Sequence, residues 1–137
     1  MSYAVSGALQ AAIFQQLAND SVLTGLVGGD IFDALPSGAV PPLYVALGPE
    51  KVSDASDMTG MGARHEITIS IVTESAGFAL AKETAAAVSD ALIDAELTLT
   101  RGTLVSLRFY KATAARVGTA DTRRIDLIFR ARVCDGT

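Results

Sequence analysis

The chain has 137 residues, of which 50% are hydrophobic and 19% are charged, and its formal net charge is −4 at pH 7. This length and composition predict one domain over residues 1–137 and exclude a mostly disordered chain. There is no run of 18 apolar residues, no basic export region at the start and only one cysteine. We therefore expect no membrane partner, no cleaved export signal, no internal disulfide and a reducing, cytoplasmic place of synthesis.

The charges are divided unevenly along the chain. Residues 1–63 carry one base and six acids, a net charge of −5, whereas residues 101–132 carry eight bases and two acids, a net charge of +6. The negative total argues against general nucleic-acid binding. A split of this kind can direct the acidic part of one subunit onto the basic part of a neighbour. The alternative is that these charges only solvate the outer faces of the strands.

The first third of the chain predicts a helix, a short helical turn and a strand. Residues 3–18 carry apolar side chains at spacings of three and four, which is typical of an amphipathic helix. Asp20 is placed to cap the short helix, and Gly28–Gly29 are placed to end it. A short apolar piece follows at residues 31–32, and a Pro-rich loop then leads to a strand that begins at Leu43.

The middle of the chain predicts a loop, a strand and a second helix. Residues 49–62 are small and polar, which indicates a long loop that is either functional or a plain hairpin connection. Residues 64–73 alternate isoleucine with polar side chains, which is typical of a half-buried strand. Residues 78–94 carry an alanine-rich apolar stripe at helical spacing, which suits close packing of a helix on a sheet.

The last third predicts a long β-hairpin. Apolar and polar side chains alternate over residues 103–110 and again over residues 125–133, and the segment 118–121 has the composition of a turn. The order of elements predicts an α+β domain. We expect an antiparallel sheet with two helices packed on one face and a long C-terminal β-hairpin.

The residues that carry enzyme chemistry are sparse. His65 is the one histidine, and no nucleophile or orienting acid can be identified for it, so it is expected to make a hydrogen bond at the strand end. One histidine and Cys134 cannot supply the usual three or four zinc ligands. Gly60 and Gly62 lack the third glycine and the following helix of a phosphate loop. We therefore expect no enzymatic activity, no catalytic or metal-binding residues and no cofactor.

Arginines gather in the predicted hairpin. Arg130 and Arg132 project from one face of the last strand, joined by Arg124 and, across the hairpin, by Arg108. Such a face could hold phosphate, but the aromatic residues that interleave in single-strand binders are few here. The pattern favours an electrostatic interface with an acidic protein. Ordinary solvated arginines are the alternative.

The ordered set of segments resembles a known family. After the opening helix come DSVLTGLVGGDIFD at 20–33 and PPLYV at 41–45. HEITISIV at 65–72 and RRIDLIFRARV at 123–133 follow in the same order. Together they resemble the tail-completion or tail-terminator proteins of long-tailed phages and gene transfer agents. The resemblance covers nearly the whole chain, and its motifs are structural.

The resemblance implies a structural virion protein without enzymatic activity or cofactor. It implies a six-membered ring at the head-proximal end of the tail tube, which stops polymerisation of the tube and offers the head connector a docking surface. The partners implied are further copies of the chain, the major tail tube protein and the head–tail connector or stopper protein. DNA would pass through the ring lumen without specific binding. Assembly would occur in the cytoplasm of the host bacterium, and the final location would be the head–tail junction of the virion.

Two alternatives stay open at this point, a neighbouring stopper ring and a nucleic-acid-binding accessory domain. The segments expected to act in assembly are residues 49–62 and the hairpin tip at 118–122. The candidate interface residues are Asp54, Asp57, Met58, Met61, Arg108, Arg124, Arg130 and Arg132.

Overall fold

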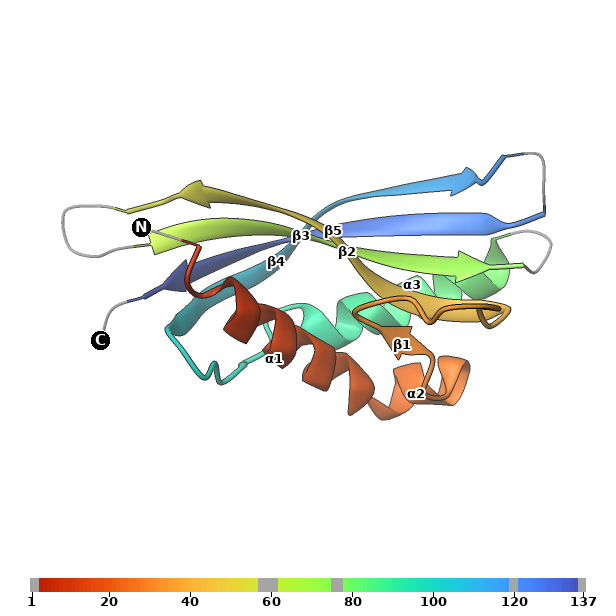
Figure 1. The fold of residues 1–137 in the computed structure, drawn as a ribbon, viewed down its shortest axis with the longest axis horizontal. Coiled ribbons are helices and arrows are strands. Elements are labelled where there is room, and N and C mark those ends of the chain that lie inside the picture. Colours follow the sequence, from red (N-terminus) through yellow and green to blue (C-terminus); the bar gives the residue numbers. More distant parts are fainter. Residues whose placement is uncertain (1–2, 57–61, 75–77, 119–120, 136–137) are drawn as a thin grey trace.

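A computed structural model describes residues 3–56, 62–74, 78–118 and 121–135. Three helices lie on one face of a five-stranded sheet (Figure 1): α1 (Ser6–Ala18), α2 (Ser21–Val27) and α3 (Ala79–Leu92). The strands are β1 (Ile31–Phe32), β2 (Leu43–Asp54), β3 (Gly62–Thr73), β4 (Thr103–Arg116) and β5 (Arg123–Cys134).

The strand order is β1-β2-β3-β5-β4, and every described pairing is antiparallel except that of β1 with β2. The expected α+β class and the long C-terminal hairpin are confirmed. The short helix expected after Asp20 forms as α2, so the described part of the chain holds three helices on the sheet face for which the predicted fold class counted two.

The ends of α2 follow the sequence closely. The Asp20 carboxylate accepts a hydrogen bond of 2.9 Å from the backbone N–H of Leu23, which satisfies one of the free donors of the first turn. The helix ends at Gly28, whose φ of 64° favours a residue without a side chain. By contrast, α1 begins at Ser6, and its cap residue Val5 offers no side-chain hydrogen bond. That helix is held by burial of its apolar face.

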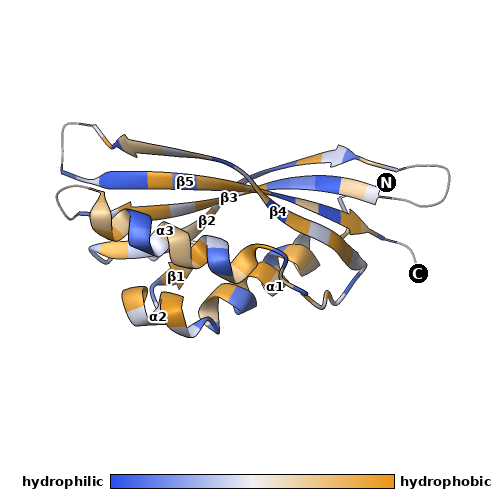
Figure 2. Cartoon of the chain, turned by 180° about the vertical axis from the view of Figure 1, so that it is seen from behind, coloured by the Kyte–Doolittle hydropathy of each residue, from blue (hydrophilic) through white to orange (hydrophobic). Residues whose placement is uncertain are grey.

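The core lies between the helices and the sheet. Hydrophobic and hydrophilic residues alternate along β5 (Figure 2), and the apolar set faces the helices. Phe129 of β5 is fully buried, and its ring lies edge-on to that of Phe109 on β4, with 6.0 Å between the ring centroids. Large, fully buried side chains come from both layers of the fold and include Leu9, Ile13 and Leu17 of α1, Leu92 of α3, and Ile69 and Ile71 of β3.

A loop was predicted over residues 49–62, and the structure shows that this prediction is wrong at both ends of the segment. β2 continues to Asp54 and β3 already begins at Gly62. Residues 57–61 lie outside the described residues. The strand was missed because Gly48 and Pro49 interrupt its alternating pattern, and these residue types are typical of loops. Pro49 is tolerated because this part of β2 lies at an edge of the sheet.

A β-bulge at this point exchanges the two faces of the sheet to which the odd- and even-numbered side chains of β2 project. Leu47 pairs with Ile69, whereas Glu50 pairs with Ile67, so β2 holds one residue more than β3 in this interval. As a result, the even-numbered side chains after the bulge face the helices, and Glu50 is carried to the helix side of the sheet.

Candidate interface on the outer sheet face

The sheet face opposite the helices carries a group of four arginines. Arg108 of β4 lies directly opposite Arg130 of β5, and Arg64 of β3 lies directly opposite Arg132 of β5. Arg130 and Arg132 alternate with buried residues of β5, so all four side chains project from the face that the helices leave uncovered. We call Arg64, Arg108, Arg130 and Arg132 the arginine cluster.

Contacts within the chain hold the cluster in place. The Arg130 guanidinium lies 3.5 Å from the centroid of the Tyr110 ring, and its Nε lies 4.0 Å from Oε1 of Glu66. Arg132 donates a hydrogen bond of 3.1 Å to the carbonyl oxygen of Ala55, just beyond the end of β2. The cluster and Tyr110 line a shallow hollow of about 320 Å³. The result is a positively charged and partly ordered surface that suits a partner with carboxylates or phosphates.

Arg124 shares this face but lies apart from the cluster. It is six residues before Arg130 on β5, a separation of about 20 Å along an extended strand. Its Nε donates a hydrogen bond of 2.8 Å to Asp126, and its Nη2 donates one of 3.2 Å to the hydroxyl of Ser70. Because Asp126 neutralises this charge, Arg124 contributes little to the positive surface.

Arg64 was not among the candidate residues predicted from the sequence. Its place beside Arg132 depends on the pairing of β3 with β5 and on their register. Alternation within each strand indicates which residues share a face, but it does not indicate which strands are neighbours. The single usable signal was that Arg64 is even-numbered, like the polar residues of β3, and so projects from the same face as they do.

The acidic candidates are described only in part. Asp54 ends β2, and its Oδ1 accepts hydrogen bonds from the hydroxyl and the backbone N–H of Ser56, at 2.7 and 3.2 Å. These hydrogen bonds hold the pKa of Asp54 below its ordinary value. Asp57, Met58 and Met61 lie outside the described residues. Asp54 therefore stays ionised at neutral pH at the edge of the sheet farthest from β4.

His65 belongs to a buried hydrogen-bond network. It is fully buried, and its Nδ1 lies 2.9 Å from Oε2 of Glu50. The other oxygen of Glu50 accepts hydrogen bonds from Tyr3, at 2.6 Å, and from Ser6, at 2.8 Å. Burial alone would raise the pKa of Glu50, but the hydrogen bonds from Tyr3, His65 and Ser6 outweigh it and hold the pKa below its ordinary value. The network ties the start of α1 to β2 and β3, in agreement with the expected hydrogen-bonding role of His65.

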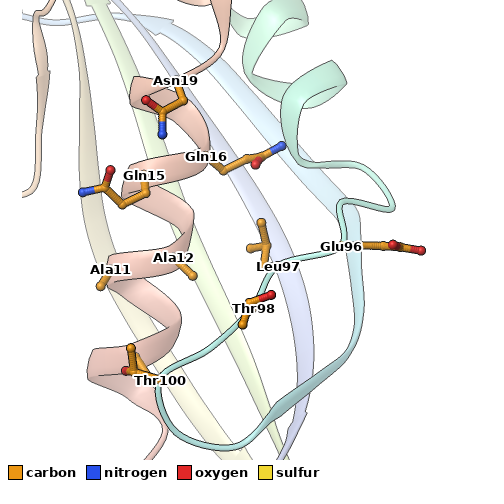
Figure 3. Close-up of a pocket in the computed structure, with 10 residues that line it drawn as sticks. Ala11, Ala12, Gln15, Gln16, Asn19, Glu96, Leu97, Thr98 and Thr100 are labelled. Carbon is orange, nitrogen blue, oxygen red and sulfur yellow. The ribbon is translucent and has the colours of Figure 1, made fainter.

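A groove of about 300 Å³ lies between α1 and the extended segment that holds Leu97, Thr98 and Thr100 (Figure 3). Among its described lining residues, Glu96 is the one titratable side chain, and the others are alanine, leucine, amide and threonine side chains. The described ranges hold no group of three or more His, Cys, Asp or Glu side chains placed to bind a metal ion. Within the same ranges, no helix combines the length and the apolar character needed to cross a membrane.

Comparisons with known proteins identify the family of the chain. The model of the family described as "Tail completion protein gp17" matches residues 11–134. The chain belongs to this family. A chain from a structure of the virion of a native gene transfer agent particle is 61% identical, with a TM-score of 0.92. That match covers 97% of this chain and 99% of the other. No curated protein matches.

The resemblance noted in the sequence is thereby confirmed. This is a structural tail-completion protein, and membership of such a family points to a non-enzymatic role.

Proposed function

We propose that this tail-completion protein forms a six-membered ring at the head-proximal end of a phage-like tail tube. The ring ends polymerisation of the tube and gives the head connector a surface on which to dock. The observation that carries this proposal is the match, along nearly the whole chain, to a polypeptide of a gene transfer agent virion. We propose that residues 1–137 act as one domain in this role.

The partners proposed follow from this position. They are further copies of the chain, the major tail tube protein and the head–tail connector or stopper protein, with no membrane and no specific nucleic-acid binding. We place the protein at the head–tail junction of the virion after assembly in the bacterial cytoplasm. DNA passes through the lumen of the proposed ring.

The surface charges are compatible with a ring. A rotationally closed ring needs two different patches of one subunit to meet. The arginine cluster projects from the outer face of β3, β4 and β5. Asp54 follows Ser53, the register partner of Arg64, so it lies beside the cluster along β2 but belongs to the other face of the sheet. Asp57, Met58 and Met61 follow Asp54 in the chain, and we propose that they share its interface. Arg124 is a weaker member of the basic patch because Asp126 neutralises it.

The nucleic-acid alternative rests on the same arginine cluster. Proteins that hold single strands usually stack bases on exposed aromatic rings. Here the guanidinium of Arg130 already lies over the ring of Tyr110, at 3.5 Å from its centroid. A base would have to displace this contact, so the cluster fits an acidic protein surface better.

Reversing two charges of the cluster is expected to weaken ring formation. The double variant Arg130→Glu with Arg132→Glu should self-associate about tenfold more weakly at low salt, because like charges then meet across the interface. Sedimentation at several salt concentrations measures this, and the deficit should shrink as salt screens the charges. The double variant Lys82→Glu with Arg101→Glu makes the same change in net charge outside the cluster and should assemble normally. Equal assembly of the two double variants would remove the electrostatic part of the proposal.

The location of the protein tests the proposed function. A peptide tag on the chain, decorated with an antibody fragment and viewed by negative-stain electron microscopy, is expected to label purified particles at the junction of head and tail. Label along the tube, at the distal tail tip or over the head would contradict the proposal.

A further inference from the structure

The outer edge of β4 is long and uncovered. In the sheet order β1-β2-β3-β5-β4 this strand is terminal, and it runs from Thr103 to Arg116. Every residue from Arg108 to Arg116 is exposed. Figure 1 shows the end of β4 extending away from the helix layer. Soluble proteins usually shorten or cover such an edge, because its unpaired backbone groups can recruit another strand.

Apolar side chains are concentrated along this edge. Val105 is 60% exposed, Phe109 45%, Tyr110 41% and Val117, just past the strand, 44%. They make up four of the nine large hydrophobic side chains exposed in the described part of the chain. Exposed apolar residues that gather on one element, and are not scattered singly, mark a contact surface.

The opposite edge of the sheet is free as well. β1 pairs with Val45 and Ala46 of β2, and the stretch from Leu47 to Asp54 has no strand on that side among the described residues. The charges of the two edges differ. β4 carries bases at Arg108, Lys111 and Arg116 and no acid, whereas the free stretch of β2 carries two acids and one base. Because Glu50 is held on the helix side by Tyr3, Ser6 and His65, Asp54 is the one acid of this stretch outside that network. The two edges therefore differ modestly in charge, and neither has a neighbouring strand among the described residues.

We propose that a second copy of this chain adds its free β2 edge to the β4 edge, so that the sheet continues from one subunit to the next. This inference rests on the proposed ring and names the surface by which its subunits meet. The added strand satisfies the backbone groups of β4 and covers the exposed apolar side chains beside them. Because the two edges are different, the contact is head-to-tail, which is the kind of interface that closes into a ring.

A second copy fits this edge because the chain itself carries the matching element. If the sheet had one free edge, an unrelated partner would be the natural occupant. Because it has two unlike free edges at opposite sides, every copy can offer its β2 edge to one neighbour and its β4 edge to another. The acidic end of β2, at Asp54, would then come to the basic side of the neighbouring sheet.

The test compares two matched valine substitutions. Val105 on β4 and Val22 on α2 are 60% and 65% exposed, so an aspartate at either position is tolerated by the monomer. Val105→Asp is expected to weaken self-association at least about tenfold, because a carboxylate is then buried in the contact between the two strands. Val22→Asp should leave self-association unchanged. Sedimentation over a range of concentrations, with thermal unfolding as a check on folding, measures both.

Hydrogen exchange gives a second readout without any substitution. Amide exchange over residues 108–116 of the wild-type chain should slow when copies assemble. If the wild type assembles while Val105→Asp assembles equally well and exchange of β4 is unchanged, the edge pairing is overturned and the proposed ring stands on another interface. The inference would also be overturned if amide exchange in β4 slowed when tail tube protein was added but did not slow when copies of this chain assembled. If the wild type forms no ring in solution or on particles, the proposed function itself fails.

Discussion

Replacing Phe129 by alanine is expected to lower the free energy of unfolding by about 3–5 kcal/mol. Phe129 is fully buried in the centre of β5, so its removal leaves a cavity that the sheet and helices cannot fill. Phe109→Ala is the matched control, since it removes the same edge-to-face ring pair from an exposed position. The control should cost only about 1 kcal/mol. Urea denaturation of both variants measures the difference.

The consequence for assembly follows from the position of Phe129. Its strand carries Arg130 and Arg132 and pairs with both β3 and β4. A loss of this size is a large part of the stability of a small domain, so Phe129→Ala should assemble poorly even at moderate temperature. If Phe129→Ala and Phe109→Ala lowered the free energy of unfolding equally, the core would not be centred on β5.

Glu50→Gln is expected to destabilise the fold by about 2 kcal/mol at pH 7, because hydrogen bonds to a charged carboxylate are lost or weakened. Glu50 accepts hydrogen bonds from Tyr3, Ser6 and His65, and an amide can keep only some of them. Glu66→Gln is the matched control. It removes a carboxylate that lies 4.0 Å from Arg130 on the outer face, and it should cost less than about 0.5 kcal/mol.

The effect of Glu50→Gln should depend on pH in a defined direction. The folded protein holds the pKa of Glu50 below its ordinary value of 4.5, so folding favours the ionised form. The stabilisation is therefore fully present above pH 4.5 and is lost as the pH falls through the lower folded value. The difference between wild type and Glu50→Gln, measured by denaturation at several pH values, should shrink below pH 4.5. A difference that grew on acidification would refute the network.

Most of the fold could be predicted from the sequence wherever an element is determined by residues close together in the chain. The Asp20 cap, the stop at Gly28 and the alternation in β3 and β5 each depend on a few neighbouring residues. The second half of β2 was not readable, because the bulge at Gly48 and Pro49 breaks the alternating pattern and resembles a loop. That error also concealed the network, since the bulge is what turns Glu50 toward His65.

The candidate interface was readable only in part. Alternation placed Arg124, Arg130 and Arg132 on one face, and the hairpin brought Arg108 opposite Arg130. Arg64 was missed because its position depends on which strand lies beside β5. The neutralisation of Arg124 was missed because the sequence does not show that its side chain turns back to Asp126. The place of Arg64 depends on tertiary pairing, which no pattern within a single strand encodes. The Arg124–Asp126 pair lies within one strand, where alternation puts both side chains on one face but does not indicate that they bond.

The length of tails in particles made without this chain tests the central claim most directly. Negative-stain electron microscopy of a producing strain that lacks the protein should show tails longer than those of the wild type and not joined to heads. Wild-type length and head attachment should return when the intact chain is supplied. Tails of normal length, whether free or joined to heads, would contradict a role in ending polymerisation of the tube.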